Sequence, residues 1–361
     1  MSEKEVMDYI KKFIGQGHGS EEEFNELALS LYAYQYKHNL PYQKYCRQKG
    51  ITPRTVKTWR QIPSVPINAF KEFSLSCTDP GKAERIFMTS GTTQGIQGKH
   101  YHPTLHLYDL SMKLNFKERF MGNNEKLKMG ILFPREENMP NSSLAHYLAL
   151  ALQEFGTEDS AYFIGDDGLK IACLIKKLEH IEESGEPYAL LGASYSFVYM
   201  LDELEKMGKV FNLPYGSRIL DTGGFKNKSR EMELDDFYNR LSRYLGVSRR
   251  DCINMYGMTE LSTQFYDEGN TVIPSIKSGP HWIRTRVINP VTEQDVPKGE
   301  QGLLVHCDLA NFNSVTTILT EDIGVEVEDG FLLLGRAQGA EAKGCSLAVE
   351  EFIQARKGTS L

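Results

Sequence analysis

The chain has 361 residues, of which 40% are hydrophobic and 25% are charged, proportions typical of water-soluble globular proteins. Because this length exceeds that of one typical domain, we expect two or three joined subdomains with a large core. The net charge of −7 disfavours a broad nucleic-acid-binding surface, and no apolar run reaches the ~18 residues that a membrane span requires.

The cysteines and the N-terminus predict a cytoplasmic protein. Six cysteines lie far apart and form no C-x-x-C pair: Cys46, Cys77, Cys173, Cys252, Cys307 and Cys345. This spacing predicts reduced thiols and disfavours both a zinc site and a disulfide framework. The first residues, Met-Ser-Glu-Lys-Glu-Val, are charged and lack the apolar segment of a secretory signal.

The N-terminal part of the chain is predicted to be helical. Apolar side chains recur at i, i+3, i+4 and i+7 in residues 2–15 and 20–39, which is the spacing of an amphipathic helix. Two further segments follow, Leu-Pro-Tyr-Gln-Lys-Tyr-Cys at 40–46 and Ile-Pro-Ser-Val-Pro-Ile-Asn-Ala-Phe-Lys at 62–71. They connect the predicted helices to a loop rich in glycine.

That loop, residues 87–99, is the most informative stretch of the chain. Its hydroxyl and glycine residues are Ser90, Gly91, Thr92, Thr93, Gly95 and Gly98. Glycine permits the left-handed turns with which backbone N–H groups surround an anion, and Lys99 adds a positive charge. A P-loop is excluded, because Thr93 stands where its first glycine belongs and His100 where Ser or Thr would bind magnesium. The pattern predicts another kind of phosphate-binding loop, with a solvated Ser/Thr/Gly linker as the alternative.

After this loop, helices alternate with short strands up to about residue 270. Buried strands are predicted at 131–134 and 189–192, and helices at 142–155, 168–183, 196–207 and 231–245. The alternation indicates βαβ units and a mostly parallel sheet. Beyond residue 270 strands predominate, with predicted strands at 302–308, 314–320 and 330–336.

Five motifs resemble those of adenylate-forming enzymes and occur in the same order. Thr89-Ser90-Gly91-Thr92-Thr93 resembles the loop T-S-G-T-T-G-x-P-K-G, although Gln97 stands at the lysine position and Lys99 comes two residues later. The other four are Leu-Asp-Thr-Gly-Gly-Phe at 220–225, Ile-Asn-Met-Tyr-Gly-Met-Thr-Glu at 253–260, Thr-Glu-Asp-Ile-Gly at 320–324 and Gly-Arg at 335–336. Each motif alone is common, but the ordered set is not.

Within that superfamily the chain is most similar to the acyl-protein synthetase family, whose founding members supply fatty acyl groups to bacterial bioluminescence and whose relatives are phenylacetate–CoA ligases. The segments at 40–46 and 62–71 resemble this family's approach to the loop. The resemblance implies an α/β fold of the adenylate-forming (ANL) type, with mixed and parallel sheets flanked by helices. A smaller C-terminal β region and a truncated or absent C-terminal lid domain are expected, because the chain ends soon after Arg336.

The expected domains are a helical N-terminal section packed on the core (1–85), an α/β adenylation core (86–270), a β-rich subdomain (271–334) and a short C-terminal segment (335–361). The implied reaction is the ATP-dependent activation of a carboxylic acid, fatty in this family, as an acyl-adenylate. The resemblance assigns the ATP phosphates to Ser90, Gly91, Thr92, Thr93 and Lys99. It assigns the base to Tyr256 and Gly224, the α-phosphate to Thr259, Mg²⁺ to Glu260, and the ribose to Asp322 and Arg336.

The second half-reaction requires a thiol. In the resembled family a cysteine near the C-terminus accepts the acyl group and passes it to a partner reductase, and Cys345 occupies that region. A neighbouring lysine and glycine would favour its thiolate and its movement. The alternative is a cysteine that only packs, in which case Cys252 is the next candidate. Gln338 and Gly339 replace two aspartates of the usual ligase pattern, so lid behaviour is not expected to follow that pattern.

Three residues are assigned to the acyl substrate by resemblance. His146 lies where relatives place an aromatic residue or His beside the carboxylate, although a His on an apolar helix is often a core residue. Gly192 and Ser194 resemble one wall of the acyl pocket, with Ser194 as a helix N-cap in the alternative.

Two other functions stay open. The first is a ligase that uses coenzyme A as its thiol, as phenylacetate–CoA ligases do. The second is a non-catalytic relative that binds an adenylate. The displaced lysine of the loop and the two missing aspartates support this alternative. An acyl reductase or an acyl-carrier protein is the expected protein partner if the acceptor is a protein thiol.

Overall fold

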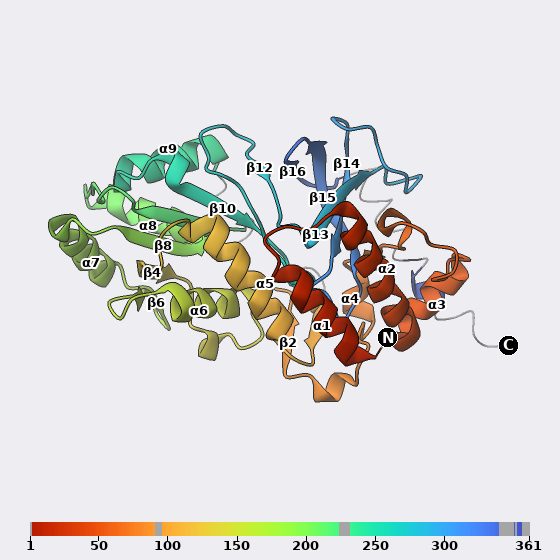
Figure 1. Cartoon of the computed structure of the whole chain (residues 1–361). Helices are drawn as coiled ribbons and strands as arrows, with labels where there is room; N and C mark the ends of the chain where they lie inside the picture. Colours follow the sequence, from red (N-terminus) through yellow and green to blue (C-terminus); the bar gives the residue numbers. More distant parts are fainter. Residues whose placement is uncertain (1, 91–95, 224–231, 339–349, 351, 356–361) are drawn as a thin grey trace. The chain divides into compact units, whose positions relative to one another are not determined.

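The structure is a computed structural model, and it describes residues 2–90, 96–223, 232–338, 350 and 352–355. The chain divides into two compact units. The first consists of Met1–Met112, Met258–Thr263 and Lys277–Leu361, and the second of Lys113–Gly257 and Gln264–Ile276. Helix α5 (His106–Phe116) carries the chain from the first unit to the second (Figure 1).

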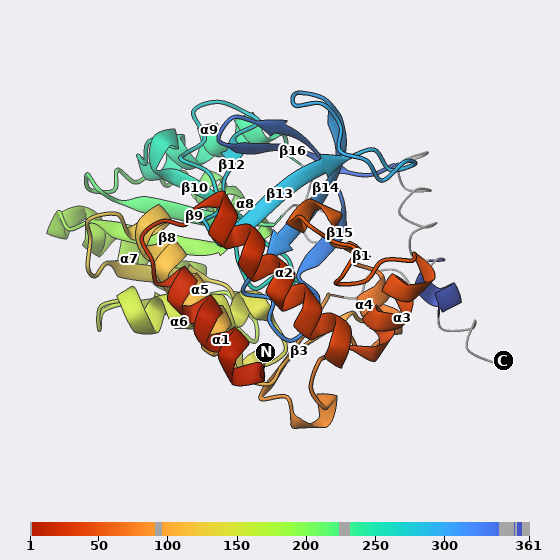
Figure 2. The ribbon, with the colours of Figure 1, turned by 45° about the vertical axis from the view of Figure 1, so that its right-hand side comes forward.

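The first unit opens with helices α1 (Glu3–Ile14), α2 (Glu21–His38) and α3 (Leu40–Gln48), coloured red in Figure 2. The predicted helices at 2–15 and 20–39 are confirmed. Both α1 and α2 begin with a capping box, Ser2 with Glu5 and Ser20 with Glu23. Each box satisfies backbone N–H groups that the first helical turn leaves without partners, which explains why the helices begin there. The short helix α4 (Ala69–Glu72) and the 3₁₀ turns Trp59–Gln61 and Pro80–Lys82 follow.

The sheet of the first unit has the strand order β12-β16-β15-β14-β13, and β1 pairs with β15. The strands are β1 (Val65–Pro66), β12 (Ile276–Lys277), β13 (Ile283–Ile288), β14 (Gln301–Asp308), β15 (Thr317–Val327) and β16 (Gly330–Arg336). Strands β13 to β16 are antiparallel to their neighbours. The predicted strands at 302–308 and 330–336 are confirmed, but β15 begins at Thr317, three residues after its predicted start. The backbone N–H of Thr316 donates to the Gln35 side chain (2.8 Å) and not to a strand.

A separate hairpin in the first unit consists of β2 (Arg85–Met88) and β3 (Lys99–His102). The predicted phosphate loop connects its two strands. Thr89 closes the base of this loop, because its backbone N–H donates to the Gly98 carbonyl (3.0 Å) and its hydroxyl accepts from the Gly98 N–H (2.9 Å).

The sheet of the second unit has the order β11-β10-β9-β8-β4-β5, in which all neighbours are parallel except β10 and β11. The predicted parallel sheet is therefore confirmed. Its strands are β4 (Lys128–Leu132), β5 (Ala161–Tyr162), β8 (Tyr188–Ala193), β9 (Arg218–Thr222), β10 (Cys252–Tyr256) and β11 (Phe265–Tyr266), and a small hairpin comprises β6 (Ile164–Gly165) and β7 (Gly168–Leu169). The four predicted helices are found as α6 (Ser143–Phe155), α7 (Ile171–Ser184), α8 (Ser194–Lys206) and α9 (Leu234–Leu245).

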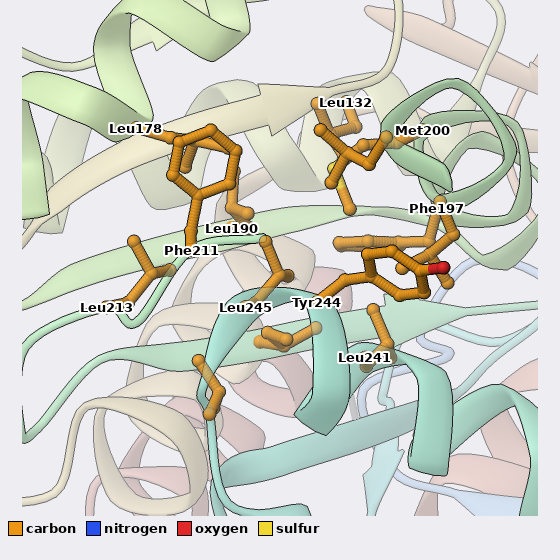
Figure 3. Close-up of a cluster of buried hydrophobic side chains, with 14 of the residues drawn as sticks. Leu132, Leu178, Leu190, Phe197, Met200, Phe211, Leu213, Leu241, Tyr244 and Leu245 are labelled. Carbon is orange, nitrogen blue, oxygen red and sulfur yellow. The ribbon is translucent and has the colours of Figure 1, made fainter. Parts of the chain in front are cut away.

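Apolar side chains from α7, α8 and α9 pack against this sheet (Figure 3). Leu132 and Leu190 come from the strands, and Leu178, Phe197 and Leu241 from the three helices. All six residues of β8 are buried, as expected for a central parallel strand covered on both faces. No helix in the described part of the chain is long and apolar enough to cross a membrane.

Strand β8 passes close to β4 at Gly192. A Cβ atom on Gly192 would lie 2.7 Å from the Leu132 carbonyl oxygen, closer than real Cβ contacts. We therefore expect Gly192→Ala to lower the free energy of unfolding by ~1–3 kcal/mol, because the strands must shift. Urea denaturation measures this change. Gly17→Ala is the control, since no atom lies within 4 Å of its added Cβ, and equal losses in both variants would contradict the packing argument.

Candidate active site

The residues of the predicted nucleotide site fall in both units, and each unit is described by itself. Gly91, Thr92, Thr93, Gly224 and Cys345 lie outside the described residues. In the first unit Ser90 and Lys99 flank the loop of the β2–β3 hairpin, and both are exposed. Their side chains are therefore free of the core and accessible to a ligand in solution.

Thr259 and Glu260 belong to a short segment, Met258–Thr263, that lies in the first unit although its flanks belong to the second. His100, on β3, donates from Nδ1 to the Thr259 carbonyl (2.9 Å). Burial lowers the pKa of His100 to about 4, so the ring is neutral at pH 7 and its Nδ1 carries the proton that the carbonyl requires. The strand that follows the predicted phosphate loop is thereby joined to Thr259. His100 was considered only as a metal ligand, for which no suitable spacing exists in the sequence, and its contact with Thr259 was not predicted.

The carboxyl group of Glu260 is buried, with 6% of the residue exposed. Burial raises its pKa to about 7, while Arg336 and Lys71 act in the opposite direction. A buried carboxylate that is costly to ionise is stabilised by a cation, and Mg²⁺ commonly takes one or two protein carboxylates together with substrate phosphates. No group of three or more metal-binding side chains is found among the described residues. The site thus suits a metal shared with a nucleotide and does not resemble an all-protein cage.

Asp322 and Arg336, both predicted to bind ribose, are register partners on β15 and β16. Arg336 Nε lies 3.4 Å from Asp322 Oδ1, and its Nη1 donates to Glu321 (2.9 Å). Glu321 also accepts from Asn68. Sequence reasoning missed Glu321, because neighbouring strand residues are expected on opposite faces, whereas the long guanidinium reaches both carboxylates. The structure therefore pairs Asp322 with Arg336, and both charges act on the pKa of Glu260, which Arg336 lowers and Asp322 raises.

In the second unit, Tyr256 ends β10 with 9% of its surface exposed, and its ring centroid lies 5.9 Å from that of Phe265. An aromatic ring at the carboxyl end of a parallel strand is well placed for a ligand, because such ends form the usual ligand crevice of α/β sheets. The following residues, Gly257 and Met258, lead the chain toward Thr259.

Ser194 is the first residue of α8, and its N-cap is Ala193, so the alternative of Ser194 as an N-cap was wrong. Its hydroxyl lies 2.8 Å from Asp221 Oδ2 and within 3.1 Å of the Thr222 and Gly223 carbonyls. Asp221 also accepts from Tyr238 (2.9 Å). The Ser194 side chain is therefore directed into a buried network at the base of the predicted Gly-Gly turn.

His146 lies on α6, and its Nδ1 is 2.8 Å from Glu136 Oε1. Glu136, which precedes the helix, was not predicted, and no spacing in the sequence distinguishes it from a surface carboxylate. The pair fixes the orientation of the imidazole ring. Cys252, the second choice for the acceptor thiol, is fully buried, and burial raises its pKa. Its thiol is therefore protonated at neutral pH and poorly suited to attack.

Comparison with known proteins identifies the family. The sequence model described as acyl-protein synthetase, LuxE, matches residues 16–354. This chain belongs to that family. A long-chain-fatty-acid–luciferin-component ligase of Vibrio harveyi is 25% identical over 345 residues, which cover 92% of this chain and 88% of the relative. A protein of the same name from Aliivibrio fischeri is 24% identical over 345 residues, which cover 91% of this chain and 88% of that relative. The family predicted from the motifs is confirmed.

Solved structures confirm the predicted fold. A 2-hydroxyisobutyryl-CoA ligase, in complex with 2-HIB-AMP and CoA, is similar with a TM-score of 0.64 at 12% identity over 89% of this chain and 71% of the ligase. ATP-bound MatB from Rhodopseudomonas palustris has a TM-score of 0.51 at 16% identity over 73% of this chain and 50% of MatB. At such identities the likeness concerns the adenylate-forming fold.

The burial of Glu260 predicts a pH-dependent stability. Its pKa is about 7 in the folded chain against the ordinary value of 4.5, so the folded state binds the proton more tightly and loses stability as the pH rises from 4.5 to 7. Glu260→Gln removes this ionisation. We expect the variant to be more stable than the wild type at pH 8 by up to about 3 kcal/mol, and this advantage to shrink at pH 5.

Urea denaturation at the two pH values measures the difference. Glu268→Gln is the matched control, because the Glu268 side chain is 86% exposed and should show little difference at either pH. A Glu260→Gln variant with the same stability gap at pH 5 and pH 8 would contradict the assignment of a raised pKa.

Proposed function

We propose that this chain activates a fatty acid with ATP as an acyl-adenylate and then transfers the acyl group to a protein thiol. The main support is the family match over residues 16–354. Further support comes from the Asp322–Arg336 ion pair and from the buried Glu260 carboxyl group, both in the first unit. The similar ligases named for long-chain fatty acids support a fatty substrate.

The first step replaces a poor leaving group with a good one. A carboxylate oxygen attacks the α-phosphorus of ATP, the bond to the β-phosphate oxygen breaks, and pyrophosphate leaves. This step requires positioning and charge neutralisation more than proton transfer. Ser90, Thr92, Thr93 and Lys99 are assigned to the phosphates and Thr259 to the α-phosphate. Mg²⁺, when bound by Glu260, would neutralise phosphate charge.

Other residues orient the nucleotide and the acid. Tyr256 and Gly224 are assigned to the base, and Asp322 with Arg336 to the ribose. His146, oriented by Glu136 (2.8 Å), is assigned to the acyl carboxylate. Gly192 and Ser194 are assigned to the acyl side of the site. The buried Ser194 hydroxyl has one proton to donate, and its nearest acceptor is Asp221 Oδ2 (2.8 Å). The Thr222 and Gly223 carbonyls lie at 3.1 Å, which favours a structural role for Ser194 beside this backbone.

In the second step, a thiolate sulfur attacks the acyl carbonyl carbon and AMP leaves, which forms a thioester. Cys345 is assigned as this thiol, and an acyl reductase or an acyl-carrier protein as the partner that receives the acyl group. The thioester keeps the acyl group activated, because a thiolate is a good leaving group in the next transfer.

The first step predicts carboxylate-dependent exchange of radioactive pyrophosphate into ATP. We expect exchange with long-chain fatty acids, its loss in Glu260→Gln, and its retention in Glu268→Gln, whose side chain is exposed. Measurement of exchange with fatty, aryl and short acids tests the proposal. A folded wild-type protein that supports no exchange with any of these acids would overturn it.

The second step predicts that Cys345→Ser separates the two half-reactions. The variant should keep pyrophosphate exchange but lose hydroxylamine-sensitive labelling by radioactive fatty acid, because a serine ester resists neutral hydroxylamine. Intact-mass analysis checks the adduct. Cys173→Ser, which changes an exposed cysteine, is the control and should label normally. Unchanged labelling in Cys345→Ser would place the acceptor elsewhere, and turnover that depends on coenzyme A would favour the CoA-ligase alternative.

A further inference from the structure

The segment Met258–Thr263, which carries Thr259 and Glu260, contains neither helix nor strand. From Glu260 onward its residues are buried. Buried backbone groups outside regular structure require partners from side chains, since an unpaired one costs as much as a lost hydrogen bond. Side chains of Asn311 and Asp308 supply such partners to this segment.

Asn311 supplies the partner of Glu260 itself. Its Nδ2 donates to the Glu260 carbonyl (2.8 Å), and its Oδ1 accepts from the Ser262 hydroxyl (2.7 Å). Asn311 is 1% exposed. One side-chain amide thus holds the segment at two points, one of them the backbone of the predicted metal-binding residue.

Asp308 holds the end of the same segment. Its Oδ2 accepts from the backbone N–H groups of Ser262 (2.9 Å) and Thr263 (2.8 Å). Its Oδ1 accepts from the Thr263 hydroxyl (2.8 Å). Burial raises the pKa of Asp308 to about 6, so the group is ionised at neutral pH and acts only as an acceptor, as these donors require.

Helix α2 fixes the loop to which Asn311 belongs. Gln35 Nε2 donates to the carbonyls of Asn311 (2.7 Å) and Phe312 (3.1 Å), and its Oε1 accepts from the Thr316 N–H (2.8 Å). Gln35 is fully buried. The amide of Asn311 therefore projects from a loop whose backbone is itself fixed.

We propose that Asn311 is a positioning residue for Glu260, and that it sets the direction in which this carboxylate meets its metal ion. The proposal rests on the proposed function, in which Glu260 binds Mg²⁺. A carboxylate that binds a metal needs a fixed backbone behind it, because mutation of the residues that orient a metal ligand typically lowers metal affinity by about 10–100-fold. Asn311 acts on the main chain of Glu260 and does not touch the substrate.

Asn311→Asp tests this role with almost no change of shape, because it replaces the donor that faces the Glu260 carbonyl by an acceptor. We expect the apparent Mg²⁺ constant of pyrophosphate exchange to rise about tenfold, with the KM for the acid unchanged. Amide hydrogen exchange of residues 258–264 should become faster in the protein without nucleotide or metal.

Asn313→Asp is the matched control. Asn313 lies in the same loop with 4% exposure, and its Nδ2 donates to Ser76 Oγ and the Tyr101 carbonyl, both at 2.9 Å. The same loss of a buried donor occurs there, but the acceptors are groups other than the Glu260 carbonyl. The Mg²⁺ constant and the amide exchange of 258–264 should stay at wild-type values in this variant.

A folded Asn311→Asp protein with wild-type Mg²⁺ dependence, or an equal rise in Asn313→Asp, would overturn the proposal. If Asn311→Asp does not fold, Ser262→Ala removes the bond from the Ser262 hydroxyl to the Asn311 amide oxygen and should produce a smaller shift in the same direction. No shift in that variant would again overturn the proposal. Amide exchange needs no activity. A wild type without pyrophosphate exchange would therefore refute the proposed function, whereas unaltered amide protection in Asn311→Asp would refute the positioning role.

Discussion

The arrangement of the first unit's candidate site depends on hydrogen bonds from buried polar side chains to one stretch of irregular backbone. The six residues Met258–Thr263 belong to the first unit, although both of their flanks belong to the second. One backbone bond lies within the segment, from the Leu261 N–H to the Met258 carbonyl (3.2 Å), and other backbone groups bond to side chains from elsewhere in the chain. His100, Asn311 and Asp308 bond to this segment from three places in the chain. Without these hydrogen bonds, the burial of Glu260 would leave backbone groups unpaired, in addition to the free-energy cost of burying its carboxyl group.

That carboxylate illustrates a common compromise between stability and function. Burial raises the pKa of Glu260 to about 7, and so the folded chain is less stable when the group is ionised. The same burial strengthens its interaction with any cation that arrives, because the surrounding dielectric is low. A buried carboxylate that is costly to ionise persists only where the surrounding structure holds it in place. The hydrogen bonds to Met258–Thr263 hold Glu260 in this way.

Many proteins share this fold, and the fold alone does not determine the activity. A CoA ligase with 12% identity has the same architecture over 89% of this chain. Since unrelated substrates can be served by one fold, the choice of acid and of acceptor must lie in the residues that line each site. In this chain Gln97 stands at the lysine position of the usual loop pattern, and Lys99 begins β3. His146 pairs with Glu136.

Local patterns in the sequence were sufficient for α1, α2, α6 to α9, the parallel sheet and the order of the motifs, because periodicity acts over a few residues. Helices α3 and α5 were not predicted. Helices α1 and α2 lie within the predicted ranges 2–15 and 20–39, and β8 and β16 lie where apolar runs predicted strands. The contacts that hold the site could not be predicted in this way, since they join residues 51 positions apart (Asn311 and Glu260) and 159 apart (His100 and Thr259). A buried asparagine and a surface asparagine look alike in a sequence. Only the tertiary structure decides which amide meets an unsatisfied carbonyl, because that depends on where distant parts of the chain are brought together.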